Sequence, residues 1–284
     1  MLITPSFSTQ KINKALKENR YVEFEAGVYD LVKPLIVYSN TDIVCQPGVV
    51  FKRRHKGRMM QLYVTPDTVK YNGTHDVTWT GGTFVADTNS ANANVITLFH
   101  SKDIRFKDLH ISGCRGLHSI EVNACKDVVI DNCFIAEQTS KDKETFREAI
   151  QIDFANKDGL SISGADGNSP CYDGTCCDGI TITDCTFFNC PNGIGTHTVS
   201  EKEKYHKNVE IKDCKFDEVH FKDIQLCGVA VCTVDCESID SSACVWLLTK
   251  NVCHLNSGGK KKLEEPRRNK AVHVYGHDVT VHIE

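Results

Sequence analysis

The chain is built from a repeated unit of two short strands joined by a polar turn. Apolar and polar residues alternate along each strand, and the full unit recurs at 95–106, 119–130 and 223–234. Shorter strands with the same alternation stand at 149–155, 179–182, 193–198 and 208–211. Such units stack on their neighbours because one unit cannot bury its apolar face alone. The repeat therefore predicts a solenoid.

A third strand completes each repeat, and it begins after a recurring cysteine. The cysteine ends the sequences DNC, TDC, KDC and VDC, at Cys133, Cys185, Cys214 and Cys236. Three strands in a coil of about two dozen residues indicate an all-β parallel β-helix with three sheets. We expect the four cysteines to form an inward stack of reduced thiols, because free cysteine behaves as a small buried hydrophobe.

Aligning the coils sets the register of one sheet. The isoleucines that mark it, and the residues two positions later, should point inward because strand side chains alternate between faces. The marks are Ile96, Ile120, Ile150, Ile194 and Ile224. The outward column one position later reads Thr97, Glu121, Gln151, Gly195 and Gln225, and the next outward column reads Phe99, Asn123, Asp153, His197 and Cys227. We expect Glu121, Asp153 and His197 to share one polar outward patch.

We interpret residues 1–284 as a single domain, with an N-terminal cap at 1–20, coils at 21–255, and a polar loop with a last coil at 256–284. Ser8 or Thr9 is expected to cap a short helix that closes the open end of the solenoid. Three inserts, at 136–147, 156–176 and 199–206, enter or leave the same sheet. Loops that wall one strip of a rigid scaffold form a cleft, so we expect the functional site there.

Composition excludes several classes of function. The net charge is −4 with both signs mixed, which does not indicate a nucleic-acid partner, and no stretch is apolar enough to span a membrane. We interpret the basic clusters at 56–58 and 260–262 as solvated loops. The N-terminus lacks the pattern of a secretory signal. This favours a cytoplasmic or virion-associated protein over one secreted through the general pathway.

The fifteen cysteines do not indicate a disulfide framework, because their number is odd and the chain is long. Cys171, Cys176 and Cys177 are the one cluster that suggests metal binding, but they lack the paired spacing of a zinc site. We therefore expect no metal and no cofactor.

The polar patch contains residues suited to cleaving a glycosidic bond, which commonly needs two carboxyl groups. Asp153 is the principal candidate, with Glu121, Glu148 or Asp173 as its partner and His197 in support. Neutral amides and aromatic rings suited to sugars are also predicted to contact substrate: Gln151, Asn123, Asn192, Gln225, Tyr172, Tyr205 and Phe99. Taken singly, each carboxylate also fits a solvated surface residue, and the prediction depends on their convergence.

Several segments resemble the pectin-lyase-like right-handed β-helix superfamily. VEFEAGVYDLVKPLIVYSNTDI is similar to the opening of many members, and GIGTHTVSEKEKYHKNVEI to a segment of polygalacturonase-type glycoside hydrolases. REAIQIDFA and YDGTCCDGITITDCTF also resemble β-helix domains of bacterial and phage surface proteins that act on glycans. The resemblance implies a right-handed helix and a polysaccharide or oligosaccharide as partner. For a tail-associated member it also implies a homo-oligomer, namely a trimer.

The chain departs from the polygalacturonase pattern at two places. The family's Asp-Asp pair is replaced by Glu148-Ala149, and its Gly-His by Asn192-Gly193. We therefore expect a hydrolase site shifted toward Asp153 and His197. Two alternatives stay open at this point. One is a glycan-binding module without catalysis, and the other is a lyase acting on uronic acids, with Arg147 as the group that neutralises the substrate carboxylate.

Overall fold

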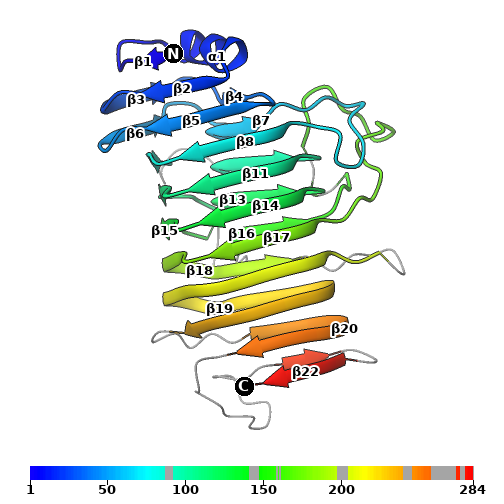
Figure 1. Ribbon diagram of the computed structural model, residues 1–284. Coiled ribbons are helices and arrows are strands. Elements are labelled where there is room, and N and C mark those ends of the chain that lie inside the picture. Colours follow the sequence, from blue (N-terminus) through cyan, green and yellow to red (C-terminus); the bar gives the residue numbers. More distant parts are fainter. Residues whose placement is uncertain are drawn as a thin grey trace.

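The chain folds into a stack of coils, seen from the side in Figure 1. The computed structural model describes residues 1–86, 92–140, 147–157, 159, 161–196, 204–238, 245–256, 273–275 and 279–283. Helix α1 (Thr9–Glu18) lies at the N-terminal end, and the strands follow below it along the stack. No helix among the described residues is long and apolar enough to cross a membrane.

Most strands are short, and three in the C-terminal half are longer. The strands are β1 (Leu2–Ile3), β2 (Tyr21–Phe24), β3 (Gly27–Leu31), β4 (Leu35–Val37), β5 (Thr41–Cys45), β6 (Val49–Arg53), β7 (Met60–Leu62), β8 (His75–Thr80), β9 (Thr83–Val85), β10 (Ile96–Phe99), β11 (Lys102–Lys107), β12 (His110–Ser112), β13 (Ile120–Asn123), β14 (Lys126–Asp131), β15 (Phe134–Ala136), β16 (Glu148–Asp153), β17 (Asp178–Thr183), β18 (Thr186–Thr196), β19 (Lys207–Ser238), β20 (Val245–Asn256), β21 (His273–Tyr275) and β22 (Val279–Ile283). The three longer strands, β18, β19 and β20, have 11, 32 and 12 residues.

Three columns of parallel strands run along the stack, and each regular coil gives one strand to each column. The first column contains β2, β5, β8, β11, β14 and β17. The second contains β3, β6, β9, β12 and β15. The third, which we call the site sheet, contains β4, β7, β10, β13 and β16 and continues into the second half of β18 and into β19. These pairings confirm the predicted three-sheet parallel β-helix.

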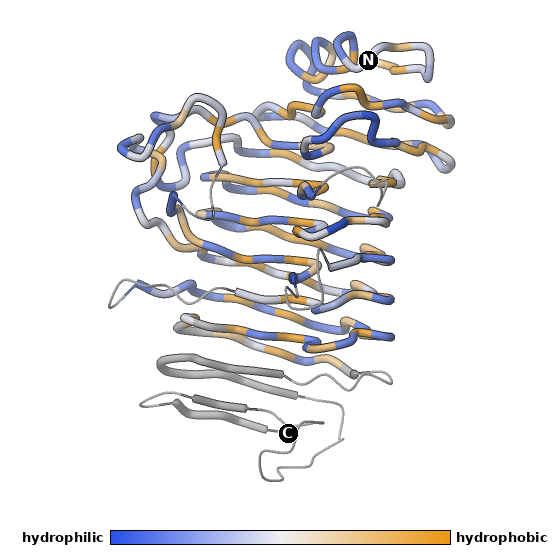
Figure 2. Tube along the Cα trace, turned by 180° about the vertical axis from the view of Figure 1, so that it is seen from behind, coloured by the Kyte–Doolittle hydropathy of each residue, from blue (hydrophilic) through white to orange (hydrophobic). Residues whose placement is uncertain are grey.

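The core fills the inside of the coils with side chains from all three columns. Apolar and polar residues alternate along the strands in Figure 2, as inward and outward positions require. The first coils hold a cluster of aromatic rings, in which Phe51 packs on Phe84 with ring centroids 4.8 Å apart. Later coils use smaller residues, mainly isoleucine and cysteine. The first coils thus fill their interior mainly with aromatic rings, and the later coils mainly with aliphatic side chains and thiols.

Helix α1 closes the N-terminal end of the solenoid as predicted. Ser8 is its N-cap and accepts a hydrogen bond from the Lys11 N–H at 3.4 Å, a contact typically worth about 1 kcal/mol. Ile12 and Leu16 are buried against the first coils. Asn13 donates to the Pro34 carbonyl and accepts from the Ile36 N–H, so the helix also binds the backbone beside β4.

The predicted cysteine stack is also present. Cys133, Cys185 and Cys214 are buried at matching positions on successive coils, and Cys236 follows them half-buried. All four are free thiols. They lie at the turn into the third strand, where Cys133 and Cys185 donate to the carbonyls of Asp131 and Thr183. The buried Leu109 holds the same position one coil earlier.

Candidate functional site

The site sheet has the predicted register. Ile96 pairs with Ile120, Ile120 with Ile150, Ile150 with Ile194, and Ile194 with Ile224. In the outward columns Glu121 pairs with Gln151, and Asn123 pairs with Asp153. Glu121 and Asp153 therefore lie on neighbouring coils but are offset diagonally. Their Cα atoms are separated by roughly 8 Å, from the usual strand spacing and rise.

The outward face is not open to solvent, which differs from the expectation. Glu121 is 5% exposed and Asp153 only 1% exposed. The cause is the insert at 156–176, which folds back over the end of the site sheet. It forms a small apolar cluster there, in which Ile162 and Cys171 pack with Phe99. Phe99 was expected to offer its ring to a sugar, but this cluster buries it.

Hydrogen bonds fasten the insert to the loop between β7 and β8. Asp173 accepts from the Lys70 N–H at 2.7 Å, and the Tyr71 hydroxyl donates to the Cys176 carbonyl at 2.9 Å. His100 lies between the two loops, with Nδ1 2.6 Å from the Lys70 carbonyl and Nε2 2.8 Å from the Cys171 carbonyl. The two loops lie on the same side of the stack in Figures 1 and 2.

Asp173, predicted as a partner carboxylate, is part of this fastening and does not line the pocket described below. Burial acts to raise its pKa, but hydrogen bonds from Lys70 and Thr175 outweigh that effect and hold the pKa below its ordinary value. Tyr172 packs against the same apolar cluster. Both residues hold the insert in place.

A polar pocket of about 710 Å³ remains beside the insert. Its walls come from four stretches of chain: 56–58, 92–94, 117–121 and 147–161. The side chains that matter for chemistry are Arg58, His118, Glu121, Arg147, Gln151 and Asp153. The pocket thus brings together four of the predicted residues, namely Asp153, Glu121, Gln151 and Arg147.

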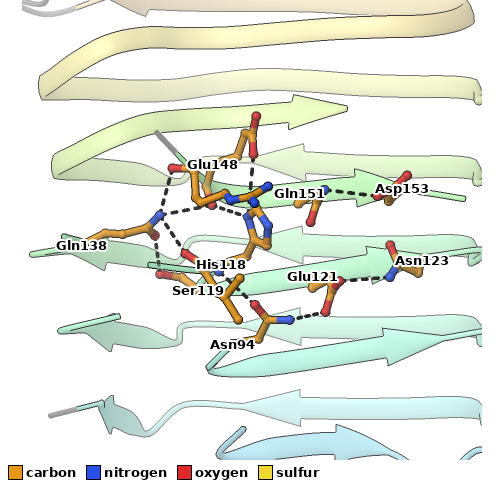
Figure 3. A network of polar contacts seen from close by, with 11 residues as sticks. Asn94, His118, Ser119, Glu121, Asn123, Gln138, Glu148, Gln151 and Asp153 are labelled. Carbon is orange, nitrogen blue, oxygen red and sulfur yellow. Dashed lines mark hydrogen bonds and ion pairs between the residues drawn. The ribbon is translucent and has the colours of Figure 1, made fainter. Parts of the chain in front are cut away.

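The two carboxylates of the pocket are held by N–H donors. Asn94 and Asn123 each donate to one oxygen of Glu121. For Asp153, the Phe154 N–H donates to Oδ1 at 2.8 Å and the Gln151 amide to Oδ2 at 3.2 Å. Figure 3 shows these side chains along the neighbouring strands. One donor on every oxygen is the arrangement that suits an ionised carboxylate.

Arg58 provides positive charge near Glu121, and its guanidinium lies 3.4 Å from the hydroxyl of Thr97, the register partner of Glu121. Its guanidinium donates to the Ser161 carbonyl at 2.9 Å and lies over the Phe99 ring, 5.3 Å from the centroid. Burial lowers the pKa of Arg58, while the nearby Glu121 carboxylate acts in the opposite direction. The sequence analysis interpreted residues 56–58 as a solvated loop. That interpretation is wrong for Arg58, because its side chain is half-buried and contacts the insert and the Phe99 ring.

His118 and Glu148 form a second polar group at the start of β13 and β16. His118 Nδ1 lies 2.8 Å from the Glu148 carbonyl oxygen and 3.8 Å from its carboxylate Oε2. The Gln138 amide donates to the carbonyls of Leu117, Arg147 and Glu148. Figure 3 shows His118 below Glu148, beside Gln151. Glu148 was predicted as an alternative acid, but it is buried behind His118 and does not line the pocket.

The remaining predicted residues lie outside the pocket. Asn123 is buried beside Glu121 and pairs in register with Asp153. Asn192 is buried and pairs in register with Glu148, and Gln225 lies two coils beyond Gln151 in the same column and accepts from Lys222. Tyr205 is half-buried near the start of β19. His197 lies outside the described residues.

Sequence reasoning missed His118, Asn94, Arg58 and Gln138. The one signal that could have found His118 is its position two residues before the register mark Ile120, where β13 begins. Asn94 and Gln138 stand in irregular segments without a repeat. Among the described residues no group of three or more histidine, cysteine or acidic side chains is arranged to hold a metal ion.

Comparison with solved structures defines the class of this protein, which has the right-handed parallel β-helix fold. PfbA, a surface adhesin of Streptococcus pneumoniae, is 15% identical over 99% of this chain and 77% of its own, with a TM-score of 0.71. A family 28 exopolygalacturonase of Yersinia enterocolitica is 10% identical over 100% of this chain and 66% of its own, with a TM-score of 0.53. Tailspike protein 3 of bacteriophage CBA120 is 11% identical over 98% and 57%, with a TM-score of 0.51.

No family profile and no curated protein sequence matches the chain. The likeness to the solved structures therefore establishes the fold.

Proposed function

We propose that this protein is a glycoside hydrolase that cleaves a polysaccharide or oligosaccharide in the pocket beside the insert. The observation that carries the proposal is that two carboxylates, Glu121 and Asp153, converge on one polar pocket. Its volume of about 710 Å³ lies within the range of small-molecule sites and suits one or two sugar rings. A fold shared with an exopolygalacturonase supports the choice of chemistry.

The two carboxylates would have different tasks. Asp153 is the base that activates a water molecule for attack on the anomeric carbon. Glu121, held as an anion by Asn94 and Asn123, stabilises the positive charge that develops on the sugar ring. Gln151 and Arg147 bind sugar oxygens from the same walls.

The test is product release from a panel of bacterial, host and plant glycans. New reducing ends and the absorbance of unsaturated uronates are measured in parallel for the wild type, Asp153→Asn and Asp184→Asn. The control Asp184 is an exposed turn residue outside the site sheet. Reducing ends without absorbance, lost in Asp153→Asn but kept in Asp184→Asn, support the hydrolase. Absorbance instead identifies a lyase and overturns the proposal.

A glycan-binding module without catalysis is the second candidate. It is favoured by the complete set of N–H donors on both carboxylates, which makes them fixed acceptors for sugar hydroxyl groups. Such a module binds a glycan of the panel and releases no product. Asp153→Asn then weakens binding, whereas in the hydrolase it removes turnover and leaves binding largely intact.

A further inference from the structure

His118 has a defined orientation at the edge of the pocket. Its ring is buried, and Nδ1 lies 2.8 Å from the backbone carbonyl of Glu148. A carbonyl oxygen only accepts hydrogen bonds, so Nδ1 must carry the hydrogen. In the neutral ring, the nitrogen that can take up a proton is therefore Nε2.

The buried carboxylate of Glu148 stabilises the ring once it is charged. Glu148 Oε2 lies 3.8 Å from His118 Nδ1, and both side chains are nearly fully buried. This oxygen has no hydrogen-bond partner among the residues the structure describes. A buried anion without donors needs a positive charge nearby, and the imidazolium form of His118 supplies it.

The backbone on both sides of the ring is fixed by amide side chains. The Gln138 amide donates to the backbone carbonyls of Leu117 and Glu148 and accepts from the Ser119 hydroxyl at 3.0 Å. Asn94 accepts from the His118 N–H at 3.0 Å while its amide donates to Glu121. The backbone of His118 and the Glu121 carboxylate are thus joined through Asn94 (Figure 3).

We propose that His118 is the proton donor of the pocket and that Glu148 is a positioning residue acting through it. The inference rests on the proposed hydrolase function, which needs a group to protonate the leaving oxygen. Both pocket carboxylates are held in the form of acceptors, so neither is arranged to donate a proton.

The step balances as follows in atoms and charge. Nε2–H of the imidazolium gives its proton to the glycosidic oxygen as the bond from that oxygen to the anomeric carbon breaks. Water forms the new bond to the anomeric carbon and gives a proton to Asp153. His118 ends neutral and Asp153 ends protonated, and exchange with solvent restores both. Glu148 is the charged group beside the ring, and the other charged groups that line the pocket are Glu121, Asp153, Arg147, Lys56 and Arg58.

The variant that tests the donor is His118→Asn. Its side-chain amide can still donate to the Glu148 carbonyl in place of Nδ1, but nothing replaces Nε2. We expect kcat to fall about 10²–10⁴-fold with little change in binding. Glu148→Gln should lower kcat less and move the alkaline limb of the pH profile to lower pH, because the imidazolium loses its counter-charge. Glu210→Gln, an acid-to-amide change on another sheet, is the matched control.

The outcomes separate the inference from the function on which it rests. Turnover in the wild type with an unchanged kcat and pH profile in His118→Asn overturns the inference and leaves the hydrolase standing. A wild type that cleaves no glycan overturns both. The ring itself is checked without any substrate by ¹⁵N NMR of the neutral imidazole. A hydrogen on Nδ1 supports the inference, and a hydrogen on Nε2 overturns it.

Discussion

Gly195 lies directly against the side chain of Glu148. A Cβ atom at position 195 would be 2.5 Å from Cγ of Glu148 and 3.1 Å from its Oε1. The two residues come from neighbouring coils of the site sheet, where Gly195 pairs with Gln151. The missing side chain is therefore what leaves room for the buried carboxylate beside His118.

Gly195→Ala should destabilise the protein by about 1–3 kcal/mol, because the methyl group forces Glu148 out of its position. Urea unfolding measures the change in free energy. Gly167→Ala is the matched control, since a Cβ there meets nothing within 4 Å. We expect the control to stay within about 0.5 kcal/mol of the wild type. Equal stability of the two variants would show that Glu148 has room to move.

Glu121→Gln should cost more stability than Asp153→Asn, although both remove one charge. In Glu121→Gln, the new NH₂ group faces the NH₂ group of Asn94 or Asn123, and two donors cannot form a hydrogen bond. Neither asparagine can turn its amide around to present an oxygen instead, because Asn94 also accepts from the His118 backbone N–H and Asn123 also donates to the Gly159 carbonyl. The expected cost in the free energy of unfolding is about 1–3 kcal/mol.

Asp153→Asn should cost less than that, because its remaining oxygen can still accept from the Phe154 N–H. Urea unfolding of both variants at neutral pH, with Asp184→Asn as reference, makes the comparison. The reverse order of stabilities would contradict the hydrogen-bond assignment at Glu121.

The insert should loosen in acid through Asp173. The pKa of Asp173 in the folded protein lies below its ordinary value. The ionised carboxylate therefore contributes its full stabilisation at a pH above the ordinary pKa, and this contribution is lost below about pH 4 as the pH falls through the lowered pKa. Asp173→Asn should produce the same loosening at neutral pH. The measurement is hydrogen exchange of the Lys70 amide, which donates to this carboxylate. Asp67→Asn, in the loop between β7 and β8 that also contains Lys70, should leave the exchange of the Lys70 amide unchanged.

Alkaline pH should destabilise the protein through its buried thiols. Burial raises the pKa of Cys114, Cys125 and Cys190 to about 12, whereas an unfolded thiol titrates near 8.5. Because the folded value is raised, the stabilisation is complete below about pH 8.5 and is lost as the pH rises toward 12.

The slope is about 1.4 kcal/mol per pH unit for each thiol. Urea unfolding under reducing conditions at pH 8 and pH 10 tests it. Cys125→Ala should reduce the slope by the contribution of one thiol. Equal stability of the wild type at both pH values would refute the claim that buried thiols destabilise the fold at alkaline pH.

Much of the fold could be predicted because the repeat is local and strict. The alternation of Ile96 with its neighbours defines a strand, and the recurrence of isoleucine at 120, 150, 194 and 224 defines the register. The N-cap of α1 was equally accessible, since Ser8 precedes an amphipathic segment. The register depends on contacts between adjacent coils, which the spacing of the repeat fixes, and the N-cap depends on a contact between residues three positions apart.

The site was harder to predict because its walls come from segments without a repeat. Asp153 and Glu121 were found through the register, but nothing in the sequence of 156–176 indicates that this insert would bury them. Arg58 and Ser161 lie 103 positions apart in the chain, and so do Lys70 and Asp173. Contacts at that separation follow no periodicity, so Arg58 was interpreted as part of a solvated loop.

The amino-acid sequence by itself determined the β-helix, the order of its coils and the column in which the two carboxylates stand, because each of these follows from a short period of apolar residues. Only the tertiary structure decided that the column is covered, that a pocket remains, and that Glu148 is buried behind His118 at the edge of that pocket. The reason is that these contacts join a strand to loops far along the chain, and their geometry depends on how irregular segments pack once the solenoid has formed.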